Sequence, residues 1–473
     1  MSTPSRPSLV GKAWHSLTRK GPLGLGRDLR DYFRWRMSQS RPVAASAPVA
    51  SLSNWDLNQQ ELRTLPEVLR SRPILLYAES TSKCNLHCFM CRLSFPETTR
   101  RVRRHMTLDT FARLEPFLEP GSRLSLFGLG EPLLNPDFVE MLRIAKGRGA
   151  FVGLNSNAML LTERIARAMV DLEQDLLVVS FSGGAPETYE KVITGASYDR
   201  VLANLRRLND LKRERTGIGR PLEQVKPLLQ LQFTAMRSNI RELPDFVRLA
   251  VELHCSGAVV MPLTLVDPSL AEESLLDPGV RPRVEEAFDG ARRVAESAGY
   301  PFDLHLPTAE LLRAWQKALS REPSGIRYQV SGTRERGDAE MRGRGDAGKG
   351  DAEHSSLITH HSEPGTQWPE PAAHDSSLMT HHSSLGLGIC HEPWQTFYLR
   401  DDGTVNTCCY SNRVLGDLRL QTALEVWNGE PYRRFRARMR SDNKPAECRV
   451  CHKLRGDDWY DQRIDDESFY DEL

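Results

Sequence analysis

Three cysteines near the start of the chain, Cys84, Cys88 and Cys91, are spaced C-x3-C-x2-C. At this spacing their sulfurs can converge on one metal centre. Three thiolates leave one iron of a [4Fe–4S] cluster without a protein ligand, because such a cluster normally takes four cysteines. An iron left open in this way can bind the N and O atoms of a substrate or cofactor. The alternative is a structural zinc site, with His87 or a remote residue as the fourth ligand.

A second group of thiols lies near the C-terminal end of the sequence. It contains Cys390, the adjacent pair Cys408 and Cys409, and the C-x2-C of Cys448 and Cys451. With one cysteine of the pair, the group supplies four thiolates, which hold either tetrahedral zinc or an iron–sulfur cluster. The spacing does not distinguish the two. The chemistry alone slightly favours zinc, because C-x2-C knuckles in cytosolic proteins are usually structural.

The composition is that of a globular chain with balanced charge. Its 473 residues are enough for two or three domains, and 40% of them are hydrophobic. The chain has 63 Lys and Arg residues against 62 Asp and Glu, which argues against a generic nucleic-acid binder. It contains no run of about 18 apolar residues, and residues 1–20 lack the apolar core of a secretory signal. We therefore expect a cytoplasmic protein without a nucleic-acid partner, in which clustered cysteines bind metal.

The two ends of the sequence carry opposite charges. Residues 1–36 have eight Lys or Arg against two Asp, and residues 456–473 have eight acidic residues against Arg463. Solvated ends are the ordinary explanation. Residues 27–36, in which aromatic and basic side chains interleave, could also contact a membrane surface. Residues 40–55 are rich in Ser, Ala and Pro and are predicted to be a linker.

Residues 331–385 have a low-complexity composition. Gly-Asp-Ala recurs three times, and the segment 355–361 returns almost unchanged as 376–382. With few aromatic or branched apolar residues, this stretch cannot bury enough surface to offset its ordering entropy. Its six histidines could bind metal. We expect instead a disordered insert that separates the two cysteine-bearing regions.

Elsewhere, short apolar runs alternate with helical patterns. The runs are four to six residues long and predict buried strands. The predicted strands are Ile74–Tyr77, Leu124–Phe127, Phe151–Leu154, Leu176–Phe181, Leu228–Phe233 and Ala258–Met261. The predicted helices are Asp137–Lys146, Thr162–Asp171, Tyr198–Lys212 and Leu243–Leu253. This alternation is typical of parallel strands with crossover helices, and therefore of an α/β fold. Cys255 follows the last of these helices and is expected to be a buried, unreactive thiol.

Several predicted strands end in residues that could hold a ligand. The second strand is followed by Gly128, Gly130, Glu131 and Pro132; glycine permits close backbone approach, and a carboxylate can pair with an ammonium group. Parallel α/β folds place their sites at the carboxyl ends of strands.

The ends of the third and fourth strands are also polar, with Asn157 after the third and Ser180 and Ser182 at the fourth. By themselves these three side chains could equally be satisfied strand-end polar groups.

The cysteine loop followed by βα units resembles the signature of the radical S-adenosylmethionine (SAM) superfamily. The resemblance implies that Cys84, Cys88 and Cys91 hold a [4Fe–4S] cluster whose open iron SAM chelates. It implies a partial (β/α)6 TIM barrel. It also implies an enzyme that takes one electron from a reductant such as flavodoxin or ferredoxin. The enzyme would cleave SAM to a 5′-deoxyadenosyl radical, which abstracts hydrogen from a substrate.

The same resemblance implies SAM contacts at the strand ends. The segment Gly128–Pro132 is similar to the family's Gly-Gly-Glu-Pro motif, in which backbone groups and the Glu hold the SAM amino group. Asn157 matches a third-strand motif near the SAM ribose and carboxylate. Met90 matches a residue that often packs on the adenine. Ser180 and Ser182 resemble the fourth-strand Ser-x-Asp-Gly, with Ser182 in the place of Asp.

The C-terminal thiols, with a Pro-Trp, an Asp-Gly-x-Val and a Trp-Asn between them, resemble the SPASM/twitch extension found behind radical SAM cores. Such extensions carry auxiliary [4Fe–4S] clusters, which reverses the preference for zinc. Full SPASM units have more cysteines and hold two clusters, so the resemblance implies one cluster here. Its ligands would be Cys390, Cys408, Cys448 and Cys451, with Cys409 as the alternative to Cys408.

These features divide the chain into five predicted regions: a basic extension and linker (1–60), a radical SAM core (73–300), the insert (331–385), an auxiliary cluster domain (386–455) and an acidic tail (456–473). By family analogy we expect a peptide or protein substrate, with dehydrogenation of a small molecule as an alternative. A non-catalytic zinc-binding adaptor is a hypothesis from a different class. It would explain the cysteines but not the glycine motif at a strand end.

Overall fold

The computed structural model describes residues 52–95, 102–308, 311 and 390–449, apart from residues 218, 265, 266, 410, 412 and 442. Its helices and strands all belong to the compact unit that begins at Asn54. The basic N-terminal segment, the insert, Cys451 and the acidic tail lie outside the described residues, and the predictions about them stay predictions. Within the described ranges, no helix is long and apolar enough to cross a membrane.

The strands form one ten-stranded sheet in the order β10-β9-β8-β1-β2-β3-β4-β5-β6-β7. Every pairing from β8 through β1 to β7 is parallel, whereas β9 and β10 pair antiparallel. The strands are β1 (Leu75–Ala78), β2 (Arg123–Leu126), β3 (Phe151–Ser156), β4 (Leu176–Ser180), β5 (Leu228–Ala235), β6 (Gly257–Pro262), β7 (Asp303–His305), β8 (Thr396–Leu399), β9 (Thr404–Asn406) and β10 (Gly416–Asp417). All six predicted strands are present, as β1 to β6.

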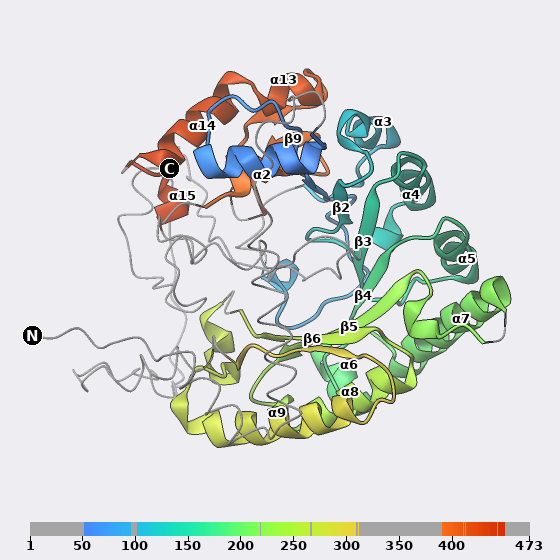
Figure 1. Cartoon of the computed structure of the whole chain (residues 1–473). Coiled ribbons are helices and arrows are strands. Elements are labelled where there is room, and N and C mark those ends of the chain that lie inside the picture. Colours follow the sequence, from blue (N-terminus) through green and yellow to red (C-terminus); the bar gives the residue numbers. More distant parts are fainter. Residues whose placement is uncertain are drawn as a thin grey trace, which may run out of the picture. The chain divides into compact units, whose positions relative to one another are not determined.

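Helices connect the parallel strands, and α4, α5, α7, α8 and α9 follow one another along the outer side of the sheet (Figure 1). The helices are α2 (Asn54–Thr64), α3 (Leu108–Ala112), α4 (Phe138–Gly147), α5 (Glu163–Asp171), α6 (Pro186–Val192), α7 (Tyr198–Thr216), α8 (Leu243–Glu252), α9 (Arg281–Glu296), α12 (Glu392–Gln395), α13 (Ala423–Trp427), α14 (Glu430–Arg440) and α15 (Ala446–Arg449). The four predicted helices are confirmed as α4, α5, α7 and α8. The mostly parallel α/β architecture is therefore confirmed.

The helix starts follow local chemistry. Thr162 caps α5, and its hydroxyl accepts a hydrogen bond from Ile165 N at 3.4 Å. Helix α4 begins after Asp137, whose side chain makes no capping hydrogen bond. The Asn135 side chain instead accepts from Asp137 N at 2.9 Å and closes the turn before the helix.

The two faces of the sheet have different surroundings. Alternate strand residues such as Leu124 and Leu126 belong to the buried cluster that also contains helix residues such as Met141. The residue between them, Ser125, points to the opposite face and is paired with Tyr77 of β1. This alternation directs apolar side chains to the helices and leaves polar side chains on the other face.

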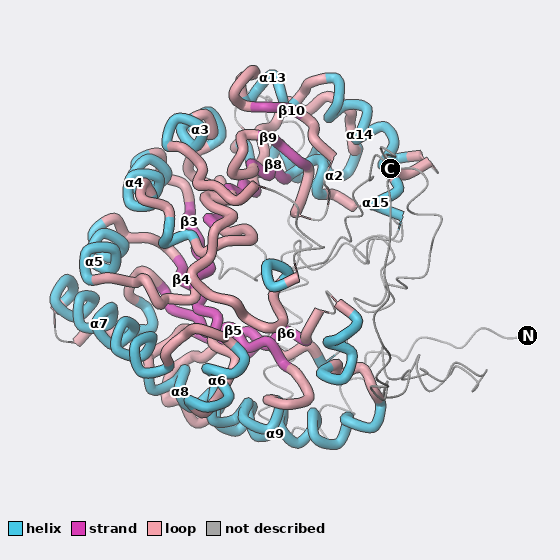
Figure 2. Tube along the Cα trace, turned by 180° about the vertical axis from the view of Figure 1, so that it is seen from behind, coloured by secondary structure: helices cyan, strands magenta, loops and turns pink. Residues whose placement is uncertain are grey.

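The C-terminal segment completes the sheet beside the first strand. Strand β8 pairs in parallel with β1, with Leu75 opposite Thr396. Figure 2 shows β8, β9 and β10 beside α2 and α14. Helix α2 occupies part of the stretch expected to be an N-terminal extension, and its Asn58 side chain donates to Trp394 O at 2.7 Å. The core and the C-terminal cysteine region thus share one sheet.

Candidate functional site

The loop of three cysteines follows the carboxyl end of β1 and is held by backbone hydrogen bonds. Cys91 N donates to Cys88 O at 3.0 Å within the loop. His87 N donates to Thr194 O, also at 3.0 Å, and this bond ties the loop to the segment after α6. The neighbouring side chain, Leu86, is buried in the core. The loop is therefore anchored on both sides of Cys88.

Cys84 and Cys91 lie close enough to Cys88 to affect it electrostatically. Cys84, Cys88 and Cys91 are thiols of intermediate burial. Burial, reinforced by the nearby charges of Cys91 and Cys84, raises the pKa of Cys88 to about 12. Burial likewise raises the pKa of Cys84. Three thiolates this close to one another need a cationic partner, and the iron of a cluster fits that donor set.

The loop is not arranged around a single ion. Among the described residues, no three His, Cys, Asp or Glu side chains are grouped to hold one metal ion. A cubane is not held in that way, because each cysteine ligates a different iron atom. The fit of the three thiols to a cluster thus rests on their loop spacing and their mutual charge effects.

The glycine motif after β2 packs directly against this loop. Glu131 N donates to Lys83 O at 2.8 Å. A Cβ on Gly130 would lie only 2.4 Å from the carbonyl oxygens of both Thr81 and Lys83, and one on Gly128 would lie 2.4 Å from the Glu79 side chain. Any larger residue at 130 would therefore push the cysteine loop away. The close backbone approach predicted for these glycines is present, and it is made to the cysteine loop.

The Glu131 side chain joins two strand ends. It is buried, and its carboxylate accepts hydrogen bonds from Ser156 Oγ (2.7 Å), Asn157 N (2.7 Å) and Leu133 N (3.1 Å). Burial raises the pKa of Glu131, and these three hydrogen bonds oppose the rise. In this geometry the carboxylate fastens the end of β2 to the end of β3. Pro132 follows it and begins a short buried turn.

Asn157 links the end of β3 to the cysteine loop. Its Nδ2 donates to Asn85 Oδ1 at 3.0 Å and lies 4.0 Å from Cys84 Sγ. Its Oδ1 accepts from Met159 N at 3.0 Å, which fixes the amide orientation. The structure therefore brings Asn157 to the first predicted ligand of the cluster.

The predicted contacts on β4 lie in two different environments. Ser182 is buried, and its Oγ accepts a hydrogen bond from Thr234 N at 3.1 Å, so it joins the ends of β4 and β5. Ser180 is the last residue of β4 and is half-buried opposite Gln232 of β5. Met90 is also half-buried and packs against the core beside the cysteines.

Sequence reasoning missed a contact between the core and the C-terminal region. The hydroxyl of Ser82, just before the cysteine loop, donates to the buried carboxylate of Asp401. The same hydroxyl accepts from Arg104 N at 3.0 Å, so a segment after the loop returns to it. Asp401 lies in the turn between β8 and β9, and no pattern in the sequence indicates its partner.

The C-terminal cysteines come from three separate elements. Cys390 precedes α12, Cys408 and Cys409 follow β9, and Cys448 lies in α15. All four are thiols of intermediate burial. Cys390 and Cys448 pack against the hydrophobic core.

Two neighbours distinguish these thiols. Thr407 Oγ lies 4.0 Å from Cys408 Sγ. Next to Cys448, the Glu447 carboxylate accepts from Arg413 Nε at 3.0 Å, an ion pair that places a cation beside that thiol. The choice between Cys408 and Cys409 stays open, and Cys451 lies outside the described residues.

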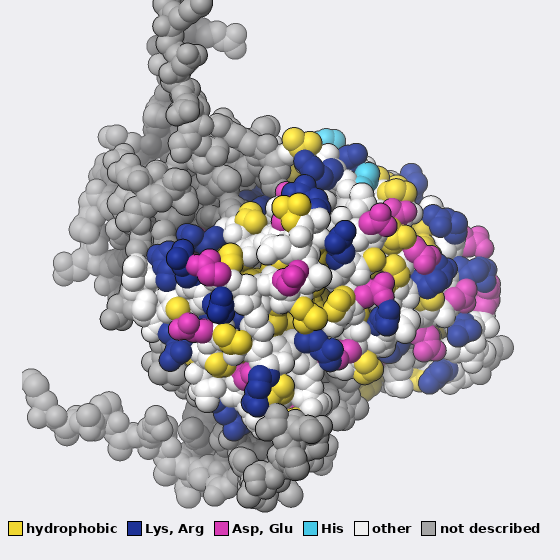
Figure 3. Space-filling view, turned by 90° about the horizontal axis from the view of Figure 1, so that it is seen from above, with side chains coloured by type: hydrophobic (Ala, Val, Ile, Leu, Met, Phe, Trp, Pro, Cys, Tyr) yellow, Lys and Arg dark blue, Asp and Glu magenta, His cyan; other side chains and the backbone are white. Residues whose placement is uncertain are grey.

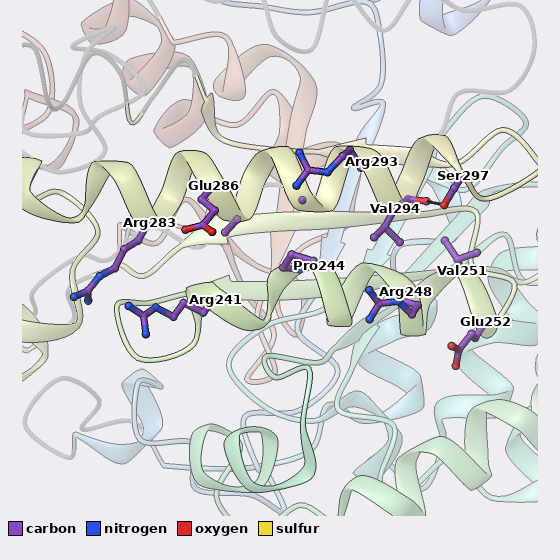
Figure 4. A pocket seen from close by; sticks show the side chains of 12 residues that line it. Arg241, Pro244, Arg248, Val251, Glu252, Arg283, Glu286, Arg293, Val294 and Ser297 are labelled. Atoms are coloured by element: carbon purple, nitrogen blue, oxygen red, sulfur yellow. Dashed lines mark hydrogen bonds between the residues drawn. The ribbon is translucent and has the colours of Figure 1, made fainter.

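The predicted residues do not lie in the groove between α8 and α9, a hollow of about 940 Å³. Figure 4 shows arginines along it, with Arg248 from α8, Arg293 from α9 and Arg241 just before α8. On the face shown in Figure 3, basic and acidic side chains are interspersed. The residues predicted to do chemistry are instead gathered at the carboxyl ends of β1 to β4.

Comparison with known families agrees with this geometry. Residues 79–222 match the radical SAM superfamily, and this stretch extends from just after β1 to just after α7. The description of the SPASM iron–sulfur cluster-binding domain matches residues 390–452. The two matches cover both groups of cysteines.

Individual relatives are more distant. A tungsten-containing aldehyde ferredoxin oxidoreductase cofactor-modifying protein from Pyrococcus furiosus is 28% identical over 243 residues, 50% of this chain and 63% of that protein. A PqqA peptide cyclase from Gluconobacter oxydans is 27% identical over 185 residues, 39% of this chain and 48% of that protein. The chain thus spans about half to just under two thirds of the length of these relatives.

A solved structure shares the fold. Streptococcus suis SuiB, bound to the precursor peptide SuiA, has a TM-score of 0.52 and 13% sequence identity, covering 89% of this chain and 80% of that one. The likeness extends over the core and the C-terminal region together. The chain thus carries a radical SAM domain and a C-terminal SPASM iron–sulfur cluster-binding domain, whose cofactors are SAM and iron–sulfur clusters.

Proposed function

We propose that this radical SAM enzyme abstracts hydrogen from a peptide or protein substrate. The observation that carries the proposal is the joining of the core and the SPASM domain in one sheet through β1 and β8. SuiB, which combines the same parts, was solved with a precursor peptide, and one relative is named as a peptide cyclase. A substrate bound at the carboxyl ends of the parallel strands would lie beside the loop of Cys84, Cys88 and Cys91.

In this proposal, Cys84, Cys88 and Cys91 hold the cluster whose open iron binds SAM. When bound, the cluster and SAM together supply a 5′-deoxyadenosyl radical after one-electron reduction. The residues of the chain position these groups. Glu131 and Asn157 hold the strand ends against the cysteine loop. A flavodoxin or ferredoxin is the proposed source of the electron.

The auxiliary cluster is proposed to be held by Cys390, Cys408, Cys448 and Cys451, with Cys409 as the alternative to Cys408. The packing of Cys390 and Cys448 against the hydrophobic core supports this assignment. A cluster at this position could accept an electron from the substrate radical that remains after hydrogen abstraction.

The test follows the hydrogen atom. Reconstituted protein, SAM and a strong reductant are incubated without oxygen with extracts of deuterium-labelled cells, separated into fractions above and below about 1 kDa. Deuterium should appear in 5′-deoxyadenosine when the fraction above about 1 kDa is supplied as the substrate. Protease treatment of that fraction should abolish the transfer. Transfer from the smaller, protease-resistant fraction would overturn the peptide proposal.

A small-molecule substrate is the second candidate, because the Pyrococcus furiosus relative is named as a cofactor-modifying protein. The same labelling experiment distinguishes the two candidates. Deuterium transfer from the smaller fraction alone is the result expected for this alternative.

A further inference from the structure

The hydroxyl of Tyr189 in α6 is buried and has no hydrogen-bond partner among the described residues. The whole side chain is inaccessible to solvent, so water does not replace the missing partner. Leaving a buried donor unsatisfied costs stability, and such a group in a native protein calls for an explanation, such as a bound ion.

Packing fixes where this hydroxyl lies. The Tyr189 ring stacks on Phe181 with centroids 4.4 Å apart and meets the edge of Tyr198 at 5.6 Å. The backbone is equally constrained, because a Cβ on Gly183 would lie 2.5 Å from Tyr189 N. The ring cannot turn away to find another partner.

Helix α6 leads into the segment that supports the cysteine loop. Thr194, which follows α6, accepts the hydrogen bond from His87 N, and Gly195 packs 3.5 Å from the Leu86 side chain. Burial, and after it the charge of Cys88, raises the pKa of Tyr189, so the phenol is protonated and within electrostatic reach of that thiolate. A protonated donor thus lies near a negatively charged sulfur.

We propose that Tyr189 Oη donates a hydrogen bond to sulfur at the cluster held by Cys84, Cys88 and Cys91, and thereby makes that cluster easier to reduce. The inference rests on the assignment of these three thiols in the proposed function. A hydrogen bond to sulfur stabilises the extra negative charge of the reduced cluster and raises its reduction potential. Tyr189 is therefore a positioning residue for the first electron transfer.

The experiment is an anaerobic redox titration of Tyr189→Phe, followed by electron paramagnetic resonance. Addition of SAM changes the spectrum of the cluster with the open iron and so separates its signal from the auxiliary cluster. We expect full iron content and a reduction equilibrium about tenfold less favourable, which for a one-electron couple lowers the midpoint by about 59 mV.

Tyr198→Phe is the matched control, because Tyr198 belongs to the same aromatic group but is only half-buried. Its midpoint should equal that of the wild type. An unchanged midpoint in Tyr189→Phe, with the cluster fully loaded, would overturn the proposal.

A second variant covers the case in which Tyr189→Phe does not take up iron. Incorporation of 3-fluorotyrosine at position 189 keeps the ring and makes the hydroxyl a stronger donor. Its midpoint should rise above that of the wild type, and no rise would overturn the proposal. If wild-type protein loads no cluster that responds to SAM, the assignment of the three thiols fails instead.

Discussion

The cysteine loop of the core and the cysteines of the SPASM domain are held in place in different ways. Cys84, Cys88 and Cys91 lie on one short loop, and the neighbouring strand ends need only press against it. In the SPASM domain, Cys390 precedes α12, Cys408 and Cys409 follow β9, and Cys448 lies in α15, so a shared site would depend on the packing of these elements. Local spacing is thus sufficient to recognise the first site, whereas the second depends on tertiary structure.

The polar side chains that support the two cysteine regions also differ in whether their partners are close or distant in the sequence. Glu131 and Asn157 act within the core, on residues that follow neighbouring strands. In the SPASM domain the central polar group is Arg436, which is fully buried and packs 4.4 Å from the Trp427 ring. Its guanidinium donates to Pro393 O, Trp427 O and Glu67 O, each at 2.9 Å, and so reaches back to the start of the core.

The largest effect is expected from Cys88→Ala. Loss of the middle thiolate removes a ligand that no neighbour can replace, and 5′-deoxyadenosine formation should fall to the level without protein. Liquid chromatography of anaerobic reactions with SAM and reductant measures this.

Cys255→Ala is the control, because Cys255 is fully buried elsewhere in the core. It should retain both iron and activity. Wild-type rates in Cys88→Ala would show that the loop does not hold the catalytic cluster.

Removing the central arginine of the SPASM domain should destabilise that domain selectively. Arg436→Met leaves several buried carbonyls without a donor, each worth about 1–3 kcal/mol, so unfolding free energy should fall by roughly 3 kcal/mol or more. Urea denaturation measures the loss, and iron analysis should show a larger loss from the auxiliary cluster than from the SAM-binding one.

Arg434→Met on the same helix provides the comparison. The Arg434 side chain is 79% exposed and pairs with Glu430 one turn away. Its loss should change stability by less than about 0.5 kcal/mol. Equal effects of the two substitutions would contradict the anchoring role of Arg436.

Gly130→Ala tests the contact between the glycine motif and the cysteine loop. The added methyl would overlap the carbonyl oxygens of Thr81 and Lys83, so the loop must shift. We expect a loss of about 1–3 kcal/mol in thermal or urea unfolding and reduced iron at the first site alone.

Gly147→Ala at the end of α4 is the matched change, because nothing lies within 4 Å of the added methyl. There the gain in helix propensity should stabilise the protein by up to about 1 kcal/mol. A Gly130→Ala protein with normal stability and iron would show that the tight contact is not required.

Glu131→Gln should have the smallest effect, with a defined pH dependence. Burial raises the folded-state pKa of Glu131 above 4.5. As the pH rises, the unfolded chain loses the Glu131 proton first, whereas the folded protein still keeps it. The contribution of Glu131 to the stability of the wild type therefore declines as the pH rises through the folded-state pKa. The advantage of wild type over Glu131→Gln, about 1 kcal/mol at pH 4.5, should therefore narrow toward pH 7.

Urea denaturation at both pH values measures this difference. Glu140→Gln, on the solvent-facing side of α4, should change stability by less than about 0.5 kcal/mol at both. A wild-type advantage that widens with pH would mean that the three hydrogen bonds outweigh burial at Glu131.

Much of the core was readable from the sequence. The six strands and the first cysteine site depend on short-range patterns: apolar runs of one strand length, helical periodicity between them, and three thiols within a single loop. A close backbone approach at the glycines after β2 could also be predicted, because only glycine allows two backbone segments to come so near.

Long-range contacts could not be predicted from such short-range patterns. The hydrogen bond from Ser82 to Asp401 joins residues 319 positions apart, and Arg436 reaches Glu67 across 369 positions. Neither pair has a spacing or periodicity that marks it, because such partners meet only after the strands have paired.

Tyr189 is the clearest case of a residue whose importance only the folded chain reveals. In the sequence it is an aromatic residue on a short helix, with no feature that distinguishes it from other core residues. In the structure its hydroxyl is buried and has no hydrogen-bond partner in the part of the chain that the structure describes. Local patterns decide which elements form and which residues could do chemistry. Packing between distant elements decides which polar groups are satisfied, and that follows from the three-dimensional arrangement alone.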